Sequence, residues 1–233
     1  MSNFIRRLLI IPARGNSKRI PKKNIKLFNN NPIINYVLST AKKSNLFHKI
    51  HVSTESEKVA KVVKKFGIKI DFMRPKELSR DHIGTLNVLK FVYNKYLSNG
   101  YSFDEVWTIP PCSPLLLRED LIKASKISKK NKNRVLLAIT RYGAPIQWAF
   151  KKNNKNFLIP LFKKEIFKRS QNFKKSYYDA GCLAVFPKKI LNKKIKDLQN
   201  KFIGFELPQE RAVDIDDLDN WKFAEYLYKA NRK

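Results

Sequence analysis

Short apolar runs alternate with longer segments of helical period through the first two thirds of this chain. The apolar runs predict strands at 8–12, 50–53, 68–73, 105–109 and 135–139. Between these runs, apolar residues recur every three to four positions, which predicts helices from 32, over 54–67, around 86–96 and around 121–127. This alternation predicts an α/β fold, Rossmann-like, whose mostly parallel sheet is covered by helices on both faces. Ligands of such sheets bind at the carboxyl ends of the strands.

Local signals predict where two of these helices begin. Asn31 followed by Pro32 predicts an N-cap with proline at the first helical position. Thr54 and Glu57 have the spacing of a capping box, and Gly67 predicts the end of that helix.

The regular alternation stops at about residue 145. Two short apolar segments, 147–150 and 157–161, flank a polar turn and predict a hairpin or arm. We expect a single domain over 1–233 with a small insertion at 145–180. Further strands are predicted at 182–186, 202–207 and 213–216, followed by a last helix over 218–228.

The composition is that of a folded protein with an extreme charge. Hydrophobic residues make up 43% of the 233 residues, which excludes a disordered chain. Lys and Arg number 49 against 19 Asp and Glu, a formal net charge of +30, and such a balance permits a nucleic-acid-binding function. The cations are spread along the whole chain, so we interpret most of them as solvated surface charge.

Two cysteines and three histidines are too few and too dispersed for a disulfide framework or a zinc site. The apolar run at 8–11 is too short for a signal peptide or a membrane span, and we expect a cytoplasmic protein.

A loop rich in cations and hydrogen-bond donors follows the first predicted strand. The apolar run stops at Pro12, and the next residues carry Arg14, Lys18, Arg19 and Lys23, with Asn16, Ser17 and Asn24 between them. Such a loop after a strand is typical of sites that hold nucleotide phosphates. A solvated basic loop is the alternative, and spacing alone leaves the two interpretations about equal.

The one dense acidic patch lies near the carboxyl terminus. Asp214 and Asp216 are two residues apart, so on a strand both point to the same face. This pair suits a hard divalent cation, Mg²⁺ or Mn²⁺, that bridges carboxylates and phosphate oxygens. The alternative is an acidic start of the last helix, with Asp217 and Asp219 as the capping residues; both interpretations can hold together.

A polar segment at 74–85 joins a predicted strand to a helix. Arg74 follows the strand and could reach a nucleotide, and Thr85 could meet a phosphate or a sugar at the helix start. The alternative is that Asp81 or Thr85 only caps the helix. The chain contains no GxGxxG, GxxxxGK[ST] or GxSxG sequence, which argues against dinucleotide-binding, Walker-type and α/β-hydrolase sites.

Taken in order, these segments resemble the cytidylyltransferases that activate nine-carbon 2-keto sugar acids, the CMP-N-acylneuraminate synthetase family. The resemblance is carried by IIPARGNSKRIPKKNIKLF, VSTESEKVAKVVKKFG, RPKELSRDHIGT and VDIDDLDNW. Within that family, RSQNFKKSYYDAG at 169–181 is similar to the form found in pseudaminic acid cytidylyltransferases.

The resemblance implies a fold of the nucleotide-diphospho-sugar transferase type and the reaction of CTP with pseudaminic acid to give CMP-pseudaminic acid and diphosphate. It implies Mg²⁺ or Mn²⁺ held by Asp214 and Asp216, which act in catalysis with Arg14 and Lys23. It also implies a homodimer in which the arm at 145–180 reaches the partner, with no membrane and no specific nucleic acid as partners.

The resemblance also places residues around each substrate. Around the nucleotide it places Ala13, Arg14, Gly15, Asn16, Ser17, Lys18, Lys23, Asn24, Arg74 and Thr85. Around the sugar acid it places Arg169, Gln171, Tyr178 and Asp179.

Two alternatives remain open from the sequence. A cytidylyltransferase for sialic, legionaminic or 3-deoxy-octulosonic acid would share the basic loop and differ around 169–184. A basic nucleic-acid-binding protein would show binding that falls steeply with salt concentration.

Overall fold

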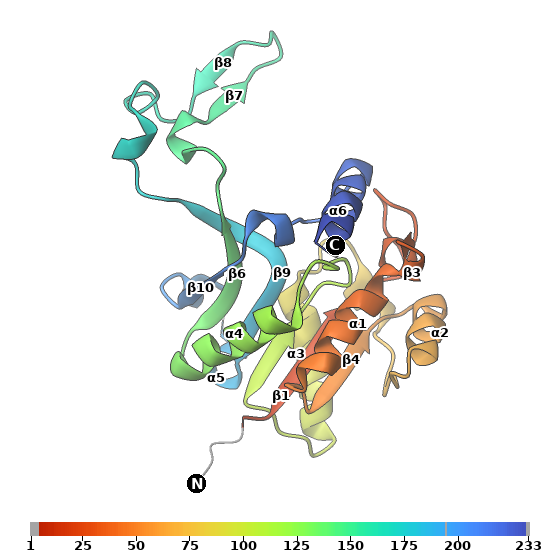
Figure 1. The fold of residues 1–233 in the computed structure, drawn as a ribbon. Helices are drawn as coiled ribbons and strands as arrows, with labels where there is room; N and C mark the ends of the chain where they lie inside the picture. The colour runs from red at the N-terminus through yellow and green to blue at the C-terminus, as the bar shows by residue number, and fades with distance from the viewer. Residues whose placement is uncertain (1–4, 194, 232–233) are drawn as a thin grey trace.

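A six-stranded sheet forms the centre of the molecule, as the computed structural model shows for residues 5–193 and 195–231 (Figure 1). The strand order is β10-β6-β9-β5-β1-β4, and only β9 runs antiparallel to its neighbours within that sheet. These strands are β1 (Arg7–Pro12), β4 (Lys49–Ser53), β5 (Glu105–Thr108), β6 (Val135–Arg141), β9 (Tyr177–Pro187) and β10 (Phe202–Glu206).

Helices cover both faces of this sheet, which confirms the predicted α/β class. The α-helices are α1 (Ile33–Ser44), α2 (Glu57–Lys65), α3 (Thr85–Ser98), α4 (Arg118–Lys130), α5 (Lys188–Leu191) and α6 (Leu218–Ala230). Short 3₁₀ turns are η1 (Lys23–Ile25), η2 (Lys76–Ser79), η3 (Ile146–Trp148), η4 (Ser170–Asn172), η5 (Ile195–Leu198) and η6 (Gln209–Arg211). Two small antiparallel pairs complete the fold: β2 (Leu27–Phe28) with β3 (Asn31–Pro32), and β7 (Phe150–Lys152) with β8 (Leu158–Pro160).

Strand β1 is apolar at every position after Arg7. Leu9 and Ile11 pack in the core shared with α1, α2 and α4, whereas Leu8 and Ile10 pack against α3 on the opposite face. All four side chains are fully buried. A strand covered on both faces needs a continuous apolar run, because neither set of alternate side chains meets water.

Two predicted strands are wrong. Residues 68–73 form no strand beside the edge strand β4. Side chains hold this segment instead: Asp71 accepts hydrogen bonds from Tyr96 Oη and Lys49 Nζ, and Phe72 stacks on His51. Residues 213–216 have no partner strand either. Their alternation still separates the side chains, because Ile215 is buried in the core while Asp214 and Asp216 face a cavity.

Both predicted helix starts are wrong in detail. Asn31 and Pro32 belong to β3, so Pro32 occupies the N-cap position and α1 begins at Ile33. The N-cap of α2 is Ser56, whose hydroxyl accepts from the Val59 amide, rather than Thr54. Thr54 Oγ1 accepts from the Ser56 amide instead.

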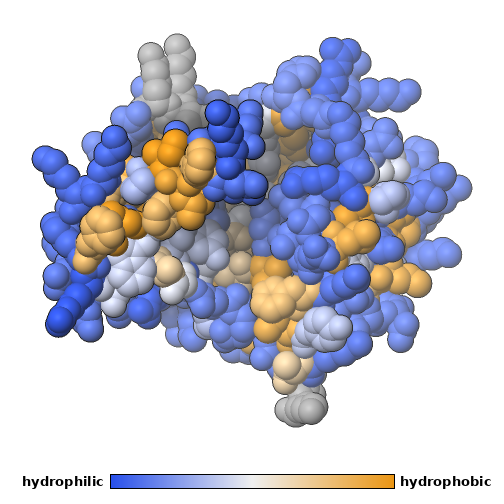
Figure 2. Space-filling model, turned by 90° about the horizontal axis from the view of Figure 1, so that it is seen from above, coloured by the Kyte–Doolittle hydropathy of each residue, from blue (hydrophilic) through white to orange (hydrophobic). Residues whose placement is uncertain are grey.

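The segment around 145–180 projects from the body as an arm that carries the β7–β8 hairpin, and β6 and β9 connect it to the sheet (Figure 1). Many of its apolar side chains are exposed, and Phe167 is 97% exposed. Figure 2 looks down on this end of the molecule and shows apolar side chains gathered over the arm. Among residues 5–193 and 195–231, no helix combines the length and apolar character that a bilayer crossing needs.

Candidate functional site

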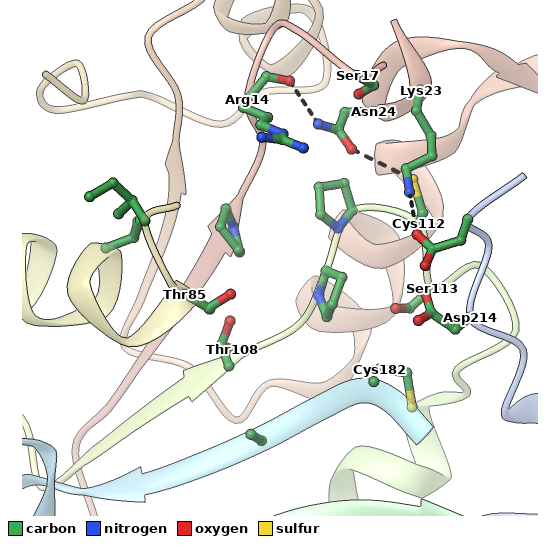
Figure 3. A pocket seen from close by; sticks show the side chains of 18 of the residues that line it. Arg14, Ser17, Lys23, Asn24, Thr85, Thr108, Cys112, Ser113, Cys182 and Asp214 are labelled. Carbon is green, nitrogen blue, oxygen red and sulfur yellow. Dashed lines mark hydrogen bonds and ion pairs between the residues drawn. The ribbon is translucent and has the colours of Figure 1, made fainter. Parts of the chain in front are cut away.

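A cavity of about 730 Å³ lies at the carboxyl ends of β1 and β5, between the start of α3 and the middle of β9 (Figure 3). This is where an α/β sheet is expected to bind a ligand. Most of the predicted site residues line it: Arg14, Ser17, Lys18, Lys23, Asn24, Arg74, Thr85, Asp179, Asp214 and Asp216.

Several predicted residues do not line this cavity. Ala13 is fully buried in the core, and its amide donates to the Ser53 carbonyl at 2.9 Å. Gly15 and Asn16 do not line it, although Arg14 before them and Ser17 after them do. The predicted sugar-acid residues of the arm also lie outside it, and the Tyr178 ring packs against Tyr142 at 4.9 Å between centroids. A substrate role for these residues stays a prediction.

The basic loop after β1 is folded back by its own side chains. Lys22 adopts a left-handed conformation with φ 52°, and the 3₁₀ turn Lys23–Ile25 follows. The buried Asn24 side chain donates to the Arg14 carbonyl at 2.8 Å and accepts from Cys112 Sγ at 3.6 Å. Asn24 therefore braces the loop against the chain that leaves β5.

The basic loop and the late carboxylates meet across the cavity. Lys23 Nζ donates to the Ile215 carbonyl at 2.7 Å and lies 3.3 Å from Asp216 Oδ1 (Figure 3). Arg19 reaches the same carboxylate oxygen at 2.9 Å. Lys23 thus lies beside two residues that are 192 and 193 positions away in the sequence.

Asp214 and Asp216 form an acidic wall of the cavity. Burial, and then the charge of Asp216, raise the pKa of Asp214 above its usual value. Gly181 lies next to it with φ +64°, and a Cβ on this glycine would lie 3.5 Å from Asp214 Oδ2. Asp217 caps α6 by accepting from the Asn220 amide at 2.8 Å, which confirms its capping role, whereas Asp219 lies in the first turn of that helix and is not the cap.

The donor set fits a magnesium ion that is shared with a ligand. No cluster of three or more His, Cys, Asp or Glu that could hold a metal occurs in the part of the chain that the structure describes. Mg²⁺ is usually held by one or two carboxylates together with water and substrate phosphate oxygens. The pair Asp214 and Asp216 matches that arrangement, and a cation would relieve the repulsion between the two carboxylates.

Asp81 faces the basic loop from the segment before α3. Its two carboxylate oxygens pair with Arg14 Nη1 at 2.7 Å and Lys18 Nζ at 2.6 Å. Hydrogen bonds from Lys18 and Arg14 hold the pKa of Asp81 below its usual value. Neither Asp81 nor Thr85 caps α3, because Gly84 occupies the N-cap and no side chain bonds there; the capping alternative is therefore wrong.

Glu55 was not predicted, although it connects two loops of the site. It accepts from the Gly15 amide at 2.7 Å, from Arg74 Nη2 at 2.8 Å and from Ser79 Oγ at 2.8 Å. Burial opposes ionisation, but these hydrogen bonds outweigh it and hold the pKa of Glu55 below its usual value. The available signal was its place just after β4, the parallel neighbour of β1.

The turn after β5 supplies another wall, including Thr108, Pro110, Cys112 and Ser113. The Thr108 and Thr85 hydroxyls point toward each other across the cavity (Figure 3). Cys112 and Cys182 are buried free thiols, and burial raises the pKa of each to about 12. Burial therefore disfavours the thiolate form that nucleophilic cysteine chemistry needs.

A sequence model of the family described as Cytidylyltransferase matches residues 8–181 of this chain. A pseudaminic acid cytidylyltransferase of Campylobacter jejuni is 33% identical over 229 residues, which cover 98% of this chain and 99% of that protein. A CMP-N,N'-diacetyllegionaminic acid synthase of Legionella pneumophila is 26% identical and covers 98% of this chain and 99% of that protein.

Two solved structures share the fold. CMP:2-keto-3-deoxy-manno-octonic acid synthetase complexed with CTP superposes with a TM-score of 0.71 at 16% identity, over 97% of this chain and 99% of that one. The 4-diphosphocytidyl-2C-methyl-D-erythritol synthase of Anaerococcus prevotii gives 0.65 at 12% identity, over 97% and 100%.

Proposed function

We propose, from the premise that this chain belongs to the cytidylyltransferase family, that it transfers CMP from CTP to pseudaminic acid and releases diphosphate. The chain is therefore a nucleotidyltransferase, and the identity of the acceptor is the proposed part. One observation carries the proposal: Lys23 of the basic loop and Asp216 of the acidic pair face each other at 3.3 Å within one cavity.

The basic loop is proposed to hold the triphosphate. Arg14, Lys18 and Lys23 all line the cavity and can neutralise charge that spreads over the phosphates as the bond to diphosphate breaks. A Mg²⁺ ion held by Asp214 and Asp216 would add further charge stabilisation when bound. Asn24 keeps the loop in place, because it bonds to the Arg14 carbonyl.

The acceptor hydroxyl is proposed to attack the α-phosphorus in line, from the side of β9. Asp179 lines the cavity there, and its Oδ1 accepts from the Gly181 amide at 2.9 Å, which fixes the bend beside Asp214. The hydroxyl proton passes to one of the two carboxylates, Asp214 or Asp216. Positioning of the two substrates and electrostatic stabilisation supply the rate enhancement.

Two observations favour pseudaminic acid among the nine-carbon acids. The segment 169–181 resembles the form found in pseudaminic acid enzymes, and a curated relative with that activity is 33% identical over nearly the full length. The legionaminic acid relative at 26% makes legionaminic acid the first alternative acceptor.

We propose that the chain acts as a homodimer whose arms contact the partner copies. The arm exposes a set of large apolar side chains: Trp148, Phe150, Phe157, Leu158, Ile159, Leu161, Phe162 and Phe167. Exposed apolar patches of this kind mark association surfaces. Light scattering would show a dimer, and replacing Phe157 and Phe167 by Ser should yield monomers.

A diphosphate-release assay tests the acceptor. Purified protein is incubated with CTP, Mg²⁺ and, in separate reactions, pseudaminic, legionaminic, sialic and 3-deoxy-octulosonic acids. We expect release with pseudaminic acid, loss of release on chelation of Mg²⁺, and none with ATP in place of CTP. Preferred turnover of another acid would replace the acceptor, and binding of nucleic acid without turnover of any acid would contradict the proposed function.

A further inference from the structure

Glu55 is the point where two loops of the site are tied together. Its Oε1 accepts from the Gly15 amide of the basic loop at 2.7 Å. Its Oε2 accepts from Arg74 Nη2 and from Ser79 Oγ, both at 2.8 Å, in the loop before α3. Arg74 and Ser79 line the cavity and Glu55 does not, so any effect of Glu55 on a ligand passes through its partners.

The pair of Glu55 and Arg74 differs from the other charged pairs of the cavity by its burial. The Arg74 side chain is 4% exposed and that of Glu55 is 16% exposed, whereas Lys18 and Asp81 are 81% and 54% exposed. The Arg74 amide also donates to the Thr54 carbonyl at 2.8 Å, so both its backbone and its side chain are fixed to the end of β4.

This ion pair changes what Arg74 can recognise. Because Glu55 balances the charge of the guanidinium, the pair carries no net charge into the cavity and attracts a phosphate much less than a free cation does. Its Nε–H is buried and has no hydrogen-bond partner among the described residues. A buried donor whose charge is balanced by Glu55 suits an uncharged acceptor such as the carbonyl oxygen of a pyrimidine base.

We infer that Glu55 is a positioning residue for base recognition: it balances the charge of Arg74 and holds its guanidinium as a hydrogen-bond donor toward the cytosine end of the nucleotide. The inference rests on the proposed function, since it concerns the CTP site. Gly15 and Ser79 are the other donors to the same carboxylate, and they fix its orientation.

The test compares Glu55→Gln with Glu57→Gln, which removes the same charge from an exposed residue two positions along the chain. Titration calorimetry measures CMP, which carries the base, and inorganic tripolyphosphate, which does not. For Glu55→Gln we expect CMP binding and the KM for CTP to weaken by about tenfold or more. Tripolyphosphate binding should not weaken, because the variant only adds net positive charge beside the cavity, and kcat and the KM for the sugar acid should stay within twofold of the original protein. Glu57→Gln should change none of these.

Ser79→Ala provides a second variant that leaves every charge in place. It removes one donor to Glu55 Oε2, and we expect CMP binding to weaken by about threefold with tripolyphosphate binding unchanged. Thermal unfolding shows whether each variant is folded.

Equal weakening of CMP and tripolyphosphate by Glu55→Gln would overturn the inference, because Glu55 would then support the loop as a whole. Unchanged CMP binding in a folded Glu55→Gln variant would overturn it as well. Failure of the proposed function is distinguishable, since the unaltered protein would then bind neither CMP nor CTP.

Discussion

Gly15 lies so close to α2 that a single methyl group there must move the basic loop. A Cβ built on Gly15 lies 2.7 Å from Ser56 Cβ, whereas ordinary contacts begin at about 3.4 Å. Ser56 cannot easily yield, because it caps α2 and its amide donates to Thr54 Oγ1. In Gly15→Ala the loop must therefore shift by the difference, about 0.7 Å. A misplacement of about 1 Å costs about 10²-fold in rate, so we expect kcat/KM for CTP to fall roughly ten- to a hundredfold.

Steady-state diphosphate release measures this loss, and Gly143→Ala is the matched control. Gly143 is exposed, and the nearest atom to its added Cβ is Gln209 Nε2 at 3.7 Å, the end of a flexible side chain. This control should keep the original kcat/KM. A folded Gly15→Ala variant with kcat/KM within twofold of the original protein would show that the position of the basic loop does not depend on this close packing.

Three further predictions concern charged groups. Asp216→Asn should lower kcat for diphosphate release by roughly 10³-fold, because it removes a proposed metal ligand, and should leave the melting temperature unchanged. Substantial activity of this variant with Mg²⁺ would show that Asp216 has no part in the mechanism. Asp81→Asn should lower the KM for CTP about two- to fivefold, because it frees Arg14 and Lys18 from an exposed pair, and a raised KM in CTP titrations would contradict this. Burial lowers the pKa of His51 to about 4. The unfolded chain therefore binds more protons than the folded chain once the pH falls below about 6.5. Because of this difference, the free energy of unfolding should fall by about 2 kcal/mol between pH 7 and pH 5. Urea titrations of His51→Phe should show that loss removed, and an equal loss in the variant would assign it to other groups.

The sheet could be predicted from the sequence wherever a strand is buried on both faces. The continuous apolar run at 8–11 predicted such a strand, and all four of its side chains are fully buried in the structure. The strand predicted at 68–73 failed because alternation does not reveal whether a partner strand exists. There, Asp71 and Phe72 are held by Tyr96 and His51 rather than by a backbone ladder.

The cavity could be predicted in part. Lys23 and Asp216 could be brought together because the ordered motifs resemble a known family, although residues 213–216 form no strand. Glu55 could not be found in this way, since its meaning depends on donors 40, 19 and 24 residues away. Sequence spacing made Glu57 the more visible acid, and it proved to be an ordinary residue of the first turn of α2.

The antiparallel strand β9 connects the arm directly to the wall of the cavity. It leaves the arm at Tyr177, passes the cavity wall at Asp179–Cys182, and ends among core side chains near Pro187. It is bonded to β5 on one side and β6 on the other, so it resists bending over much of its length. A contact made by the arm therefore acts on the same strand that carries Asp179, and in the proposed dimer β9 would join the subunit contact to the proposed acceptor side of the cavity.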